Sequence, residues 1–475
     1  MSRGADALVR TLAAAGVRKM FALSGNHVMP VFDAALDAGV DIIHVRHEAA
    51  AVHMADAWAR LTGEVGVALV TGGPGHANAV SALYTALEAE SPVLLLSGHA
   101  PLGELGKGAF QEMRQADMAA PVTRASWTMR SIDEIGRALR EAQAGPVHLS
   151  LPQDVLDARF DGSIHLPAPV SEPKEPWPDE LFTAKRPLVI AGPGMMRKSR
   201  GLEEASGIPV IGMESPRGVN DPALGKLADV LACADAVLLL GKKLDFTLRF
   251  GNAFAPDCRL LTSQSIWPSR KANGSAWLDE VRAALAYRPP QWKQITGSLH
   301  PVAVCRGVQE LLKESDAVLV CDGGEFGQWA QACLRAPHRV INGPAGSIGR
   351  EARVTTCAGR RDARRRHVRF PHVGDRHRRA LRFELPRGCR QRRLLERRVP
   401  DRAQGLRQGA GEEPRSPSHA LRRRFRRARR ARGGCRRFRG AWPGARASQK
   451  SGQTGLRQRT HRAPSGAQIL KTIGL

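Results

Sequence analysis

Residues 41–76 read DIIHVRHEAAAVHMADAWARLTGEVGVALVTGGPGH, and this stretch decides the fold. Ile42–Val45 and Val65–Val70 are short apolar runs typical of strands, and the alanine-rich segment Glu48–Leu61 between them predicts a helix. Strands joined by helices indicate a parallel sheet, because a parallel connection must cross from one end of the sheet to the other. Apolar strands of this kind predict that helices cover both faces of the sheet.

The same alternation continues on both sides of this stretch. Further strands are expected at Met20–Leu23, Val93–Ser97 and Val147–Leu151, and a helix is expected at Ala5–Ala15. We therefore expect residues 1–165 to form an α/β domain with a doubly wound parallel sheet.

Two more α/β units follow a proline-rich linker at Pro167–Pro178. The expected strands of a central domain, residues 180–290, are Pro187–Ala191, Ile208–Met213, Ala236–Gly241 and Leu260–Thr262. The unit at residues 300–349 is expected to contain helix Val304–Glu314, strand Ala317–Cys321, helix Gln328–Leu334, strand Arg339–Ile341 and turn Gly343–Gly349. From residue 350 to 475 neither a helical nor a strand pattern persists, so we expect an Arg-rich, disordered segment without a folded domain.

Charge divides the chain at the same place. The 475 residues include 72 Lys and Arg and 45 Asp and Glu, a formal net charge of +27. Residues 351–475 hold 37 of the basic and 8 of the acidic residues, a net charge of +29, which leaves a net charge of −2 for residues 1–350. Arg-dense segments bind phosphate backbones non-specifically, so a nucleic-acid-binding protein is an alternative from another class. The segment has few aromatic side chains for base stacking and no RGG-type repeat, which disfavours that alternative.

Cysteine usage and hydropathy exclude other classes. The eight cysteines form no CxxC pair, which argues against a zinc site and a disulfide framework. The chain has no signal-peptide pattern at its start and no apolar run of the roughly 18 residues that a membrane span needs. A cytoplasmic protein without membrane partners is expected.

Candidate site residues lie where the expected strands of the first domain end. Glu48 begins a helix directly after a strand, and glycine turns follow two neighbouring strands, Ser24-Gly25-Asn26 and Gly72-Gly73-Pro74. The carboxyl ends of parallel strands are where α/β proteins bind ligands. The alternative for Glu48 is a helix cap, because a carboxylate is favoured in a first helical turn. We expect His47 and His76 to serve in packing rather than in proton transfer.

Several stretches of this domain resemble the pyrimidine-binding domain of thiamine diphosphate (ThDP) enzymes, in particular the acetolactate synthase-like group. The matching stretches are LSGNHVMPVFDAALDAGV (23–40), residues 42–101, GAFQEM (108–113) and GPVHLSLPQDV (145–155). ADAVLLLGKKLDFTLRFG (234–251) is similar to the central domain of the group, which holds FAD or ADP in some members. VLVCDGGEFGQWA (318–330) and INGPAGSIG (341–349) resemble the opening of its diphosphate-binding domain.

The resemblance implies an enzyme that uses ThDP and Mg²⁺ on a 2-oxo acid, a decarboxylase and carboligase of acetolactate synthase type. Glu48 would be the catalytic residue, because a glutamate at this position hydrogen-bonds the pyrimidine ring of ThDP. The other implied cofactor-binding positions are Gly25, Asn26, Gly73, Pro74, Asn78, Gln111, Gly324, Glu325, Gly346, Ser347 and Ile348. For Gln111, a solvated glutamine at a helix end is an equal alternative.

The resemblance also leaves choices open. FAD in the central domain is a candidate cofactor, and a homodimer or homotetramer is implied because the site of the group lies between two subunits. A 2-hydroxyacyl-CoA lyase or an oxalyl-CoA decarboxylase-like enzyme is the alternative within the family, because LLLGKKLDFTLRFG is comparable to their central domains.

The Mg²⁺ ligands of the family are missing. They come from a Gly-Asp-Gly turn and a later Asn, and this chain contains no Gly-Asp-Gly; the nearest stretch is Gly374-Asp375-Arg376. When codons permitted for RRHVRFPHVGDRH (365–377) are read one base out of frame, they can spell DGTFGFHMSEID, a sequence typical of the family. In the same frame, permitted codons of three later segments can also spell family-like sequences, in the order in which the family has them. We therefore expect a frameshift after about residue 350, and a literal chain that binds ThDP and Mg²⁺ poorly.

Overall fold

The computed structural model describes residues 2–162, 174–272, 276–294, 300–312, 317–345 and 367–369. Its first sheet has six strands in the order β2-β1-β3-β4-β6-β5, and every neighbouring pair is parallel. The strands are β1 (Lys19–Ala22), β2 (Asp41–His44), β3 (Gly66–Val70), β4 (Val93–His99), β5 (Ala125–Thr128) and β6 (Val147–Pro152). The α/β class with a parallel sheet is therefore confirmed.

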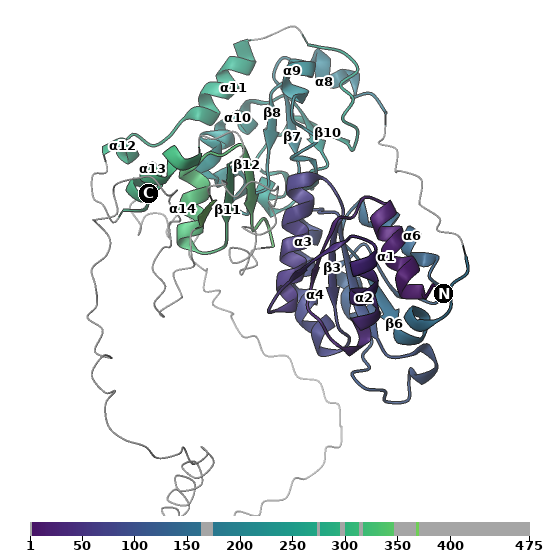
Figure 1. Ribbon diagram of the computed structural model, residues 1–475. Helices are drawn as coiled ribbons and strands as arrows, with labels where there is room; N and C mark the ends of the chain where they lie inside the picture. Colours follow the sequence, from purple (N-terminus) through teal and green to yellow (C-terminus); the bar gives the residue numbers. More distant parts are fainter. Residues whose placement is uncertain are drawn as a thin grey trace, which may run out of the picture. The chain divides into compact units, whose positions relative to one another are not determined.

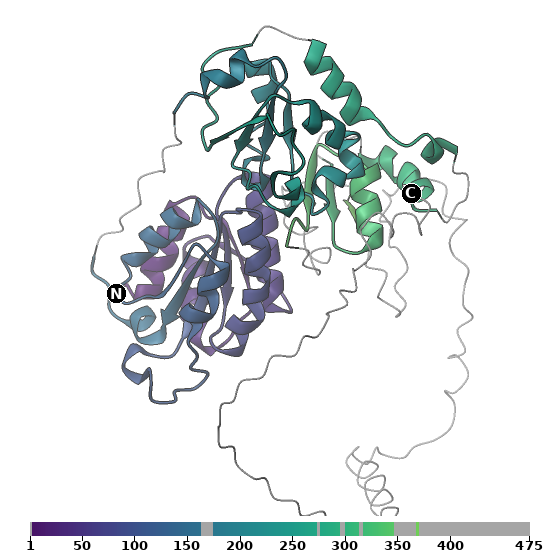
Figure 2. The same cartoon turned by 180° about the vertical axis from the view of Figure 1, so that it is seen from behind.

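Helices cover both faces of this sheet, as Figures 1 and 2 show. On one face lie α1 (Gly4–Ala14), α2 (Met29–Asp37), α6 (Glu134–Ala142) and α7 (Gln153–Asp157). On the other lie α3 (Glu48–Thr62), α4 (Pro74–Glu88) and α5 (Gln115–Ala119). Strand residues alternate between the two cores: Leu69 faces the first, whereas Ala68 and Val70 face the second. This two-sided burial explains why β3 is apolar along its whole length.

The central sheet is also parallel, in the order β10-β9-β7-β8. Its strands are β7 (Pro187–Ala191), β8 (Val210–Gly212), β9 (Ala236–Leu240) and β10 (Arg259–Ser263). The helices α8 (Asp179–Thr183) and α9 (Leu202–Ser206) contribute to one core, and α10 (Leu227–Cys233) and α11 (Ala276–Ala286) to the other. The observed strands agree with the expected ones to within a few residues at their ends.

A third sheet has the order β12-β11-β13, with β11 (Val318–Cys321), β12 (His338–Ile341) and β13 (His367–Arg369). The helices of this part are α12 (Gln291–Gln294), α13 (Pro301–Gln309) and α14 (Glu325–Cys333). The expectation of no strand after residue 350 is wrong at β13, which pairs in parallel with β11. Three residues are too few to show a period in the sequence, and the open edge of β11 supplies their partner. The rest of residues 350–475 lies outside the described residues, and the domain limits stay predictions.

No helix in the described part of the chain is long and apolar enough to cross a membrane.

Candidate functional site

The turns that follow β1 and β3 approach each other closely at the carboxyl edge of the first sheet. A Cβ atom on Gly25 would lie 2.5 Å from the Cβ of Thr71, so only glycine fits there. His27 and Thr71 join the two turns a second time, with 3.3 Å between Nδ1 and Oγ1. Asn26 is exposed and opens the short 3₁₀ helix Asn26–Val28.

Glu48 is the first residue of α3 and is half-buried. Its Oε2 accepts a hydrogen bond of 3.1 Å from Nδ2 of Asn78, which lies on α4. Its Oε1 faces Gly75 and lies 3.5 Å from the place that a Cβ atom there would take. Backbone N–H groups at the start of a helix favour a negative charge, so the carboxylate is stabilised where it stands.

His47 caps α3. Its Nδ1 accepts a hydrogen bond of 3.2 Å from the backbone N–H of Ala49, and the side chain is exposed. His47 therefore serves as a helix cap, where strand-end packing was expected. The cap satisfies an N–H group that the helix itself leaves without an acceptor.

Gln111 lies beside the turn at Gly73. Both residues have positive φ angles, +56° and +58°. A Cβ atom on Gly73 would lie 2.6 Å from the carbonyl oxygen of Gln111, so the two turns touch along their backbones. Gln111 stands in a turn before α5 rather than at a helix end. The structure thus brings Gln111 to the strand-end group.

Glu112 organises the loop that carries Gln111, a role that the sequence alone did not indicate. Its carboxylate accepts backbone N–H groups from Gly106, Gly108 and Ala109 at 2.5, 3.0 and 3.1 Å. These hydrogen bonds, that of Gly106 foremost, hold the pKa of the Glu112 carboxyl below its usual range.

Gln115 is a second residue that sequence reasoning missed. It is 1% exposed, and its Oε1 accepts the backbone N–H of Gly73 at 2.7 Å. Its Nε2 donates to the Gly98 carbonyl and to Ser150 Oγ, both at 3.1 Å. One side chain therefore connects the turn after β3 with β4 and β6.

Buried histidines extend this polar interior. His76 is fully buried; its Nδ1 lies 2.9 Å from Ser97 Oγ, and its ring centroid lies 4.5 Å from that of His148. Burial lowers the pKa of His76 to about 4 and the pKa of His148 well below its usual range. Both rings are therefore neutral at pH 7, and His76 serves in packing, as expected from the sequence.

Of the remaining expected positions, Pro74 belongs to the same turn as Gly73, whereas the others lie far along the chain. Pro74 is exposed and begins α4. Gly324, with φ of +85°, precedes α14 after β11 of the third sheet, and Glu325 begins that helix. Gly346, Ser347 and Ile348 lie outside the described residues. Within the described ranges no three side chains of His, Cys, Asp or Glu gather in one place.

The arrangement can bind a planar polar ring. It offers an accessible carboxylate at a helix start, a neighbouring amide, and glycine turns that allow the strand-end segments to approach one another closely. A carboxylate accepts only, so it selects a ring that presents an N–H group. These residues fit the aminopyrimidine half of ThDP.

Comparison with known proteins agrees with this geometry. Residues 2–118 match the family model described as thiamine pyrophosphate enzyme, N-terminal TPP binding domain. The chain is 30% identical over 445 residues to 2-hydroxyacyl-CoA lyase 2 of Mus musculus, covering 73% of this chain and 70% of that protein. It is 29% identical over 379 residues to the acetolactate synthase large subunit IlvG of Mycobacterium tuberculosis, covering 68% and 69%. The acetolactate synthase isozyme 3 large subunit of Escherichia coli is 32% identical over 267 residues, covering 48% and 45%.

Proposed function

Because this chain belongs to the thiamine diphosphate-dependent enzymes, in the family of acetolactate synthases and 2-hydroxyacyl-CoA lyases, we propose a decarboxylase and carboligase of 2-oxo acids. The observation that carries this proposal is the Glu48 carboxylate, which Asn78 holds at the start of α3 beside glycine turns. The substrate in this proposal is a small-molecule 2-oxo acid.

Each side chain has a part in this proposal. Glu48 would accept the ring N–H of the pyrimidine and so hold a proton at the ring atom facing its carboxylate. Asn78 fixes the Oε2 atom of that carboxylate by its 3.1 Å hydrogen bond, and Gln111 is held at the same edge by its contact with Gly73. When bound, ThDP supplies the carbon nucleophile and the electron sink that breaking a bond beside a carbonyl requires.

A 2-hydroxyacyl-CoA lyase is the second candidate. The chain is similar to the mouse 2-hydroxyacyl-CoA lyase 2 over 70% of the length of that enzyme, and it is similar to the mycobacterial acetolactate synthase over 69%. The two similarities favour the two candidates equally. Both candidates use the Glu48 group in the same way, so only the products distinguish them.

We also propose that residues from about 350 onward are a shifted reading frame of the diphosphate-binding domain. The alignment with the mouse enzyme covers 73% of the 475 residues, about 347, a length close to that of the part before the Arg-rich segment. The missing Gly-Asp-Gly turn supports poor binding of Mg²⁺ by the literal chain. Nucleic-acid binding would then be an accidental, non-specific property of that segment.

Three further properties are proposed on the resemblance. The protein assembles as a homodimer or homotetramer, and the central domain takes FAD. A cytoplasmic location is supported by the free thiols of Cys233, Cys258, Cys305, Cys321 and Cys333, which suit a reducing compartment.

A comparison of two chains tests the proposed function: the chain as printed, and a version with the frame restored after codon 350. We expect only the restored chain, given ThDP and Mg²⁺, to turn pyruvate into acetolactate or to cleave a 2-hydroxyacyl-CoA. In the restored chain, Glu48→Gln should lower kcat at least about a hundredfold, because general acid–base contributions are of that order. The matched control Glu104→Gln, at an exposed position, should leave kcat unchanged. A restored chain inactive on both substrates, or full activity of Glu48→Gln, would overturn the proposal.

A further inference from the structure

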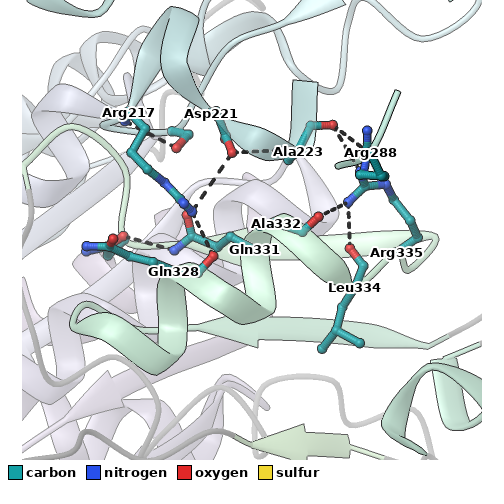
Figure 3. A network of polar contacts seen from close by, with 11 residues as sticks. Arg217, Asp221, Ala223, Arg288, Gln328, Gln331, Ala332, Leu334 and Arg335 are labelled. Atoms are coloured by element: carbon teal, nitrogen blue, oxygen red, sulfur yellow. Dashed lines mark hydrogen bonds and ion pairs between the residues drawn. The ribbon is translucent and has the colours of Figure 1, made fainter. Parts of the chain in front are cut away.

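Two arginine side chains converge on one backbone carbonyl of the described residues. Arg288, which follows α11, donates from Nη2 to the carbonyl oxygen of Ala223 at 2.9 Å. Arg335, which follows α14, donates from its own Nη2 to the same oxygen at 3.0 Å (Figure 3). The two nitrogens are therefore at most about 6 Å apart, the sum of these distances, and two positive charges so close repel each other.

Arg335 is held in place through both its side chain and its backbone. Its Nη1 donates to the carbonyls of Leu334 and Ala332, at 2.9 and 3.4 Å. The side chain of Gln309 accepts the Arg335 N–H at 2.8 Å and donates to the Arg335 carbonyl at 2.9 Å. Although Arg335 is exposed, its guanidinium group is thus fixed before any ligand arrives, which lowers the entropy cost of binding.

Arg288 is half-buried and is fixed in the same way, by hydrogen bonds from Nη1 to the carbonyls of Leu285 and Tyr287. The exposed Lys226 brings a third positive charge to this region, because its Nζ lies 4.6 Å from the centroid of the Tyr287 ring. The backbone N–H of Lys226 donates to the Ala284 carbonyl of α11 at 3.0 Å. Lys226 and Arg288 therefore both stand at the carboxyl end of that helix.

The protein balances only part of this positive charge. In the part of the chain that the structure describes, Arg288 and Arg335 form no ion pair, and all their side-chain hydrogen bonds go to backbone carbonyls. Asp221, two residues before the shared carbonyl, lies 3.9 Å from Arg217 and shares its charge with that cation. The carboxyl ends of α11 and α14 each supply about half a negative charge, so capping of these helices leaves the arginine pair with about +1. Lys226 raises the net charge of the region to about +2.

Both guanidinium groups keep N–H donors for a ligand. Each has five donors, and the three hydrogen bonds of Arg288 and the three of Arg335 leave two donors on each side chain. A carboxylate ligand has one charge and two oxygens in one plane, so it would occupy a single guanidinium group. A phosphate dianion has two charges, and its tetrahedral oxygens can accept from both groups at once. The charge and the remaining donors therefore favour a phosphate.

We propose that Arg288 and Arg335 form a binding site for a phosphate dianion, supplied as free orthophosphate or as the phosphate group of a small phosphate monoester. The site is separate from the positions expected for the ThDP diphosphate. Those positions, Gly324 and Glu325, lie at the amino end of α14, whereas Arg335 follows its carboxyl end. The nine residues of α14, at about 1.5 Å each, place the two ends about 13 Å apart.

Labelling with phenylglyoxal, which modifies arginine, tests the site in the full, unaltered chain without ThDP. Sodium orthophosphate is varied at constant ionic strength, and mass spectrometry follows each modified arginine, so phosphate bound by the Arg-rich segment does not enter the result. Labelling of Arg335 should slow saturably, by about tenfold at ten times the dissociation constant, because about one site in eleven is then free. Arg282, which lies on α11 and pairs with Glu203 at 2.8 Å, is the internal control and should label at an unchanged rate. Sodium acetate should protect neither arginine.

Two variants and a second probe complete the test. Arg288→Gln should raise the orthophosphate concentration that half-protects Arg335 at least about tenfold, because a charge-assisted hydrogen bond is lost. Arg282→Gln removes the same charge from the same region of the chain and should leave that concentration unchanged. Protection at a lower concentration of phenyl phosphate than of orthophosphate would assign a monoester as the ligand, and the reverse order would assign the free ion.

Three results would overturn the proposal. They are equal slowing of labelling at Arg335 and Arg282, equal protection of Arg335 by acetate and orthophosphate, and an unchanged half-protecting concentration in a folded Arg288→Gln chain. None of these results bears on the Glu48 site, because the labelling is done without ThDP and reads Arg335 directly.

Discussion

Replacing Gln115 by alanine should loosen the turn that carries Gly73. The change removes three hydrogen bonds and leaves the Gly73 N–H and the Gly98 carbonyl without the partner that held them. Each orphaned buried group costs about 1–3 kcal/mol, and water entering the vacated space reduces the sum. We expect a loss of about 3 kcal/mol, which corresponds to about a hundredfold in an equilibrium constant.

Hydrogen exchange resolved by peptide measures this effect where it arises. In Gln115→Ala, peptides that contain the Gly73 amide should exchange about a hundredfold faster, because that amide loses its acceptor. Gln115→Glu keeps the acceptor but loses both donated bonds, so the chain should lose stability while the Gly73 amide stays protected. The control Gln291→Ala, at an exposed position, should change neither. Unchanged exchange at Gly73 in Gln115→Ala would refute the reasoning.

Three more predictions concern the described parts of the chain. Gly73→Ala should lower the free energy of unfolding by about 1–3 kcal/mol more than Gly39→Ala does, as measured by urea unfolding. Both glycines have a positive φ, but only at Gly73 would the new Cβ atom also meet a backbone atom, the carbonyl oxygen of Gln111. Lowering the pH from 7 to 5 should reduce the free energy of unfolding by about 2 kcal/mol through His76 alone. The pKa of His76 is about 4 in the folded chain and about 6.5 in the unfolded chain, so stability is lost as the pH falls below about 6.5. Arg339→Met should lower the free energy of unfolding by about 3 kcal/mol, because the buried Glu214 carboxylate, which accepts a hydrogen bond of 2.7 Å from Arg339, is left without this partner. Adding Glu214→Leu should recover most of that loss.

Controls separate these effects from general damage. Removing the more exposed ion pair of Arg282 with Glu203 should change stability by less than about 1 kcal/mol. His76→Gln should reduce the loss of stability between pH 7 and 5 by about 2 kcal/mol and leave the contribution of the buried His148, whereas His44→Gln, at an exposed position, should not reduce it. Equal costs for the two glycine variants, a pH dependence that His76→Gln leaves unchanged, or a double variant no more stable than Arg339→Met would contradict the respective prediction.

Strands buried on both faces were predictable from the sequence, and Pro187–Ala191 was predicted with its observed limits. The strand Ala125–Thr128 was missed because it lies at the sheet edge with all four residues half-buried, so it shows no alternation. Glu48 and the glycine turns were predictable because ligand sites of such sheets gather at strand ends. Gln115 was not, because its hydrogen bonds reach residues 17 to 42 positions away and nothing local marks it. The contact between Gly73 and Gln111 is likewise a product of the tertiary fold.

Calorimetric titration of the full chain with ThDP, with and without Mg²⁺, tests the central claim most directly. That claim is that residues 1–345 carry the pyrimidine half of a ThDP site, with Glu48 at its centre, and that the chain as printed lacks the Gly-Asp-Gly turn of the metal half. We expect weak binding whose strength does not change when Mg²⁺ is added. Tight binding that depends on Mg²⁺ would contradict the account.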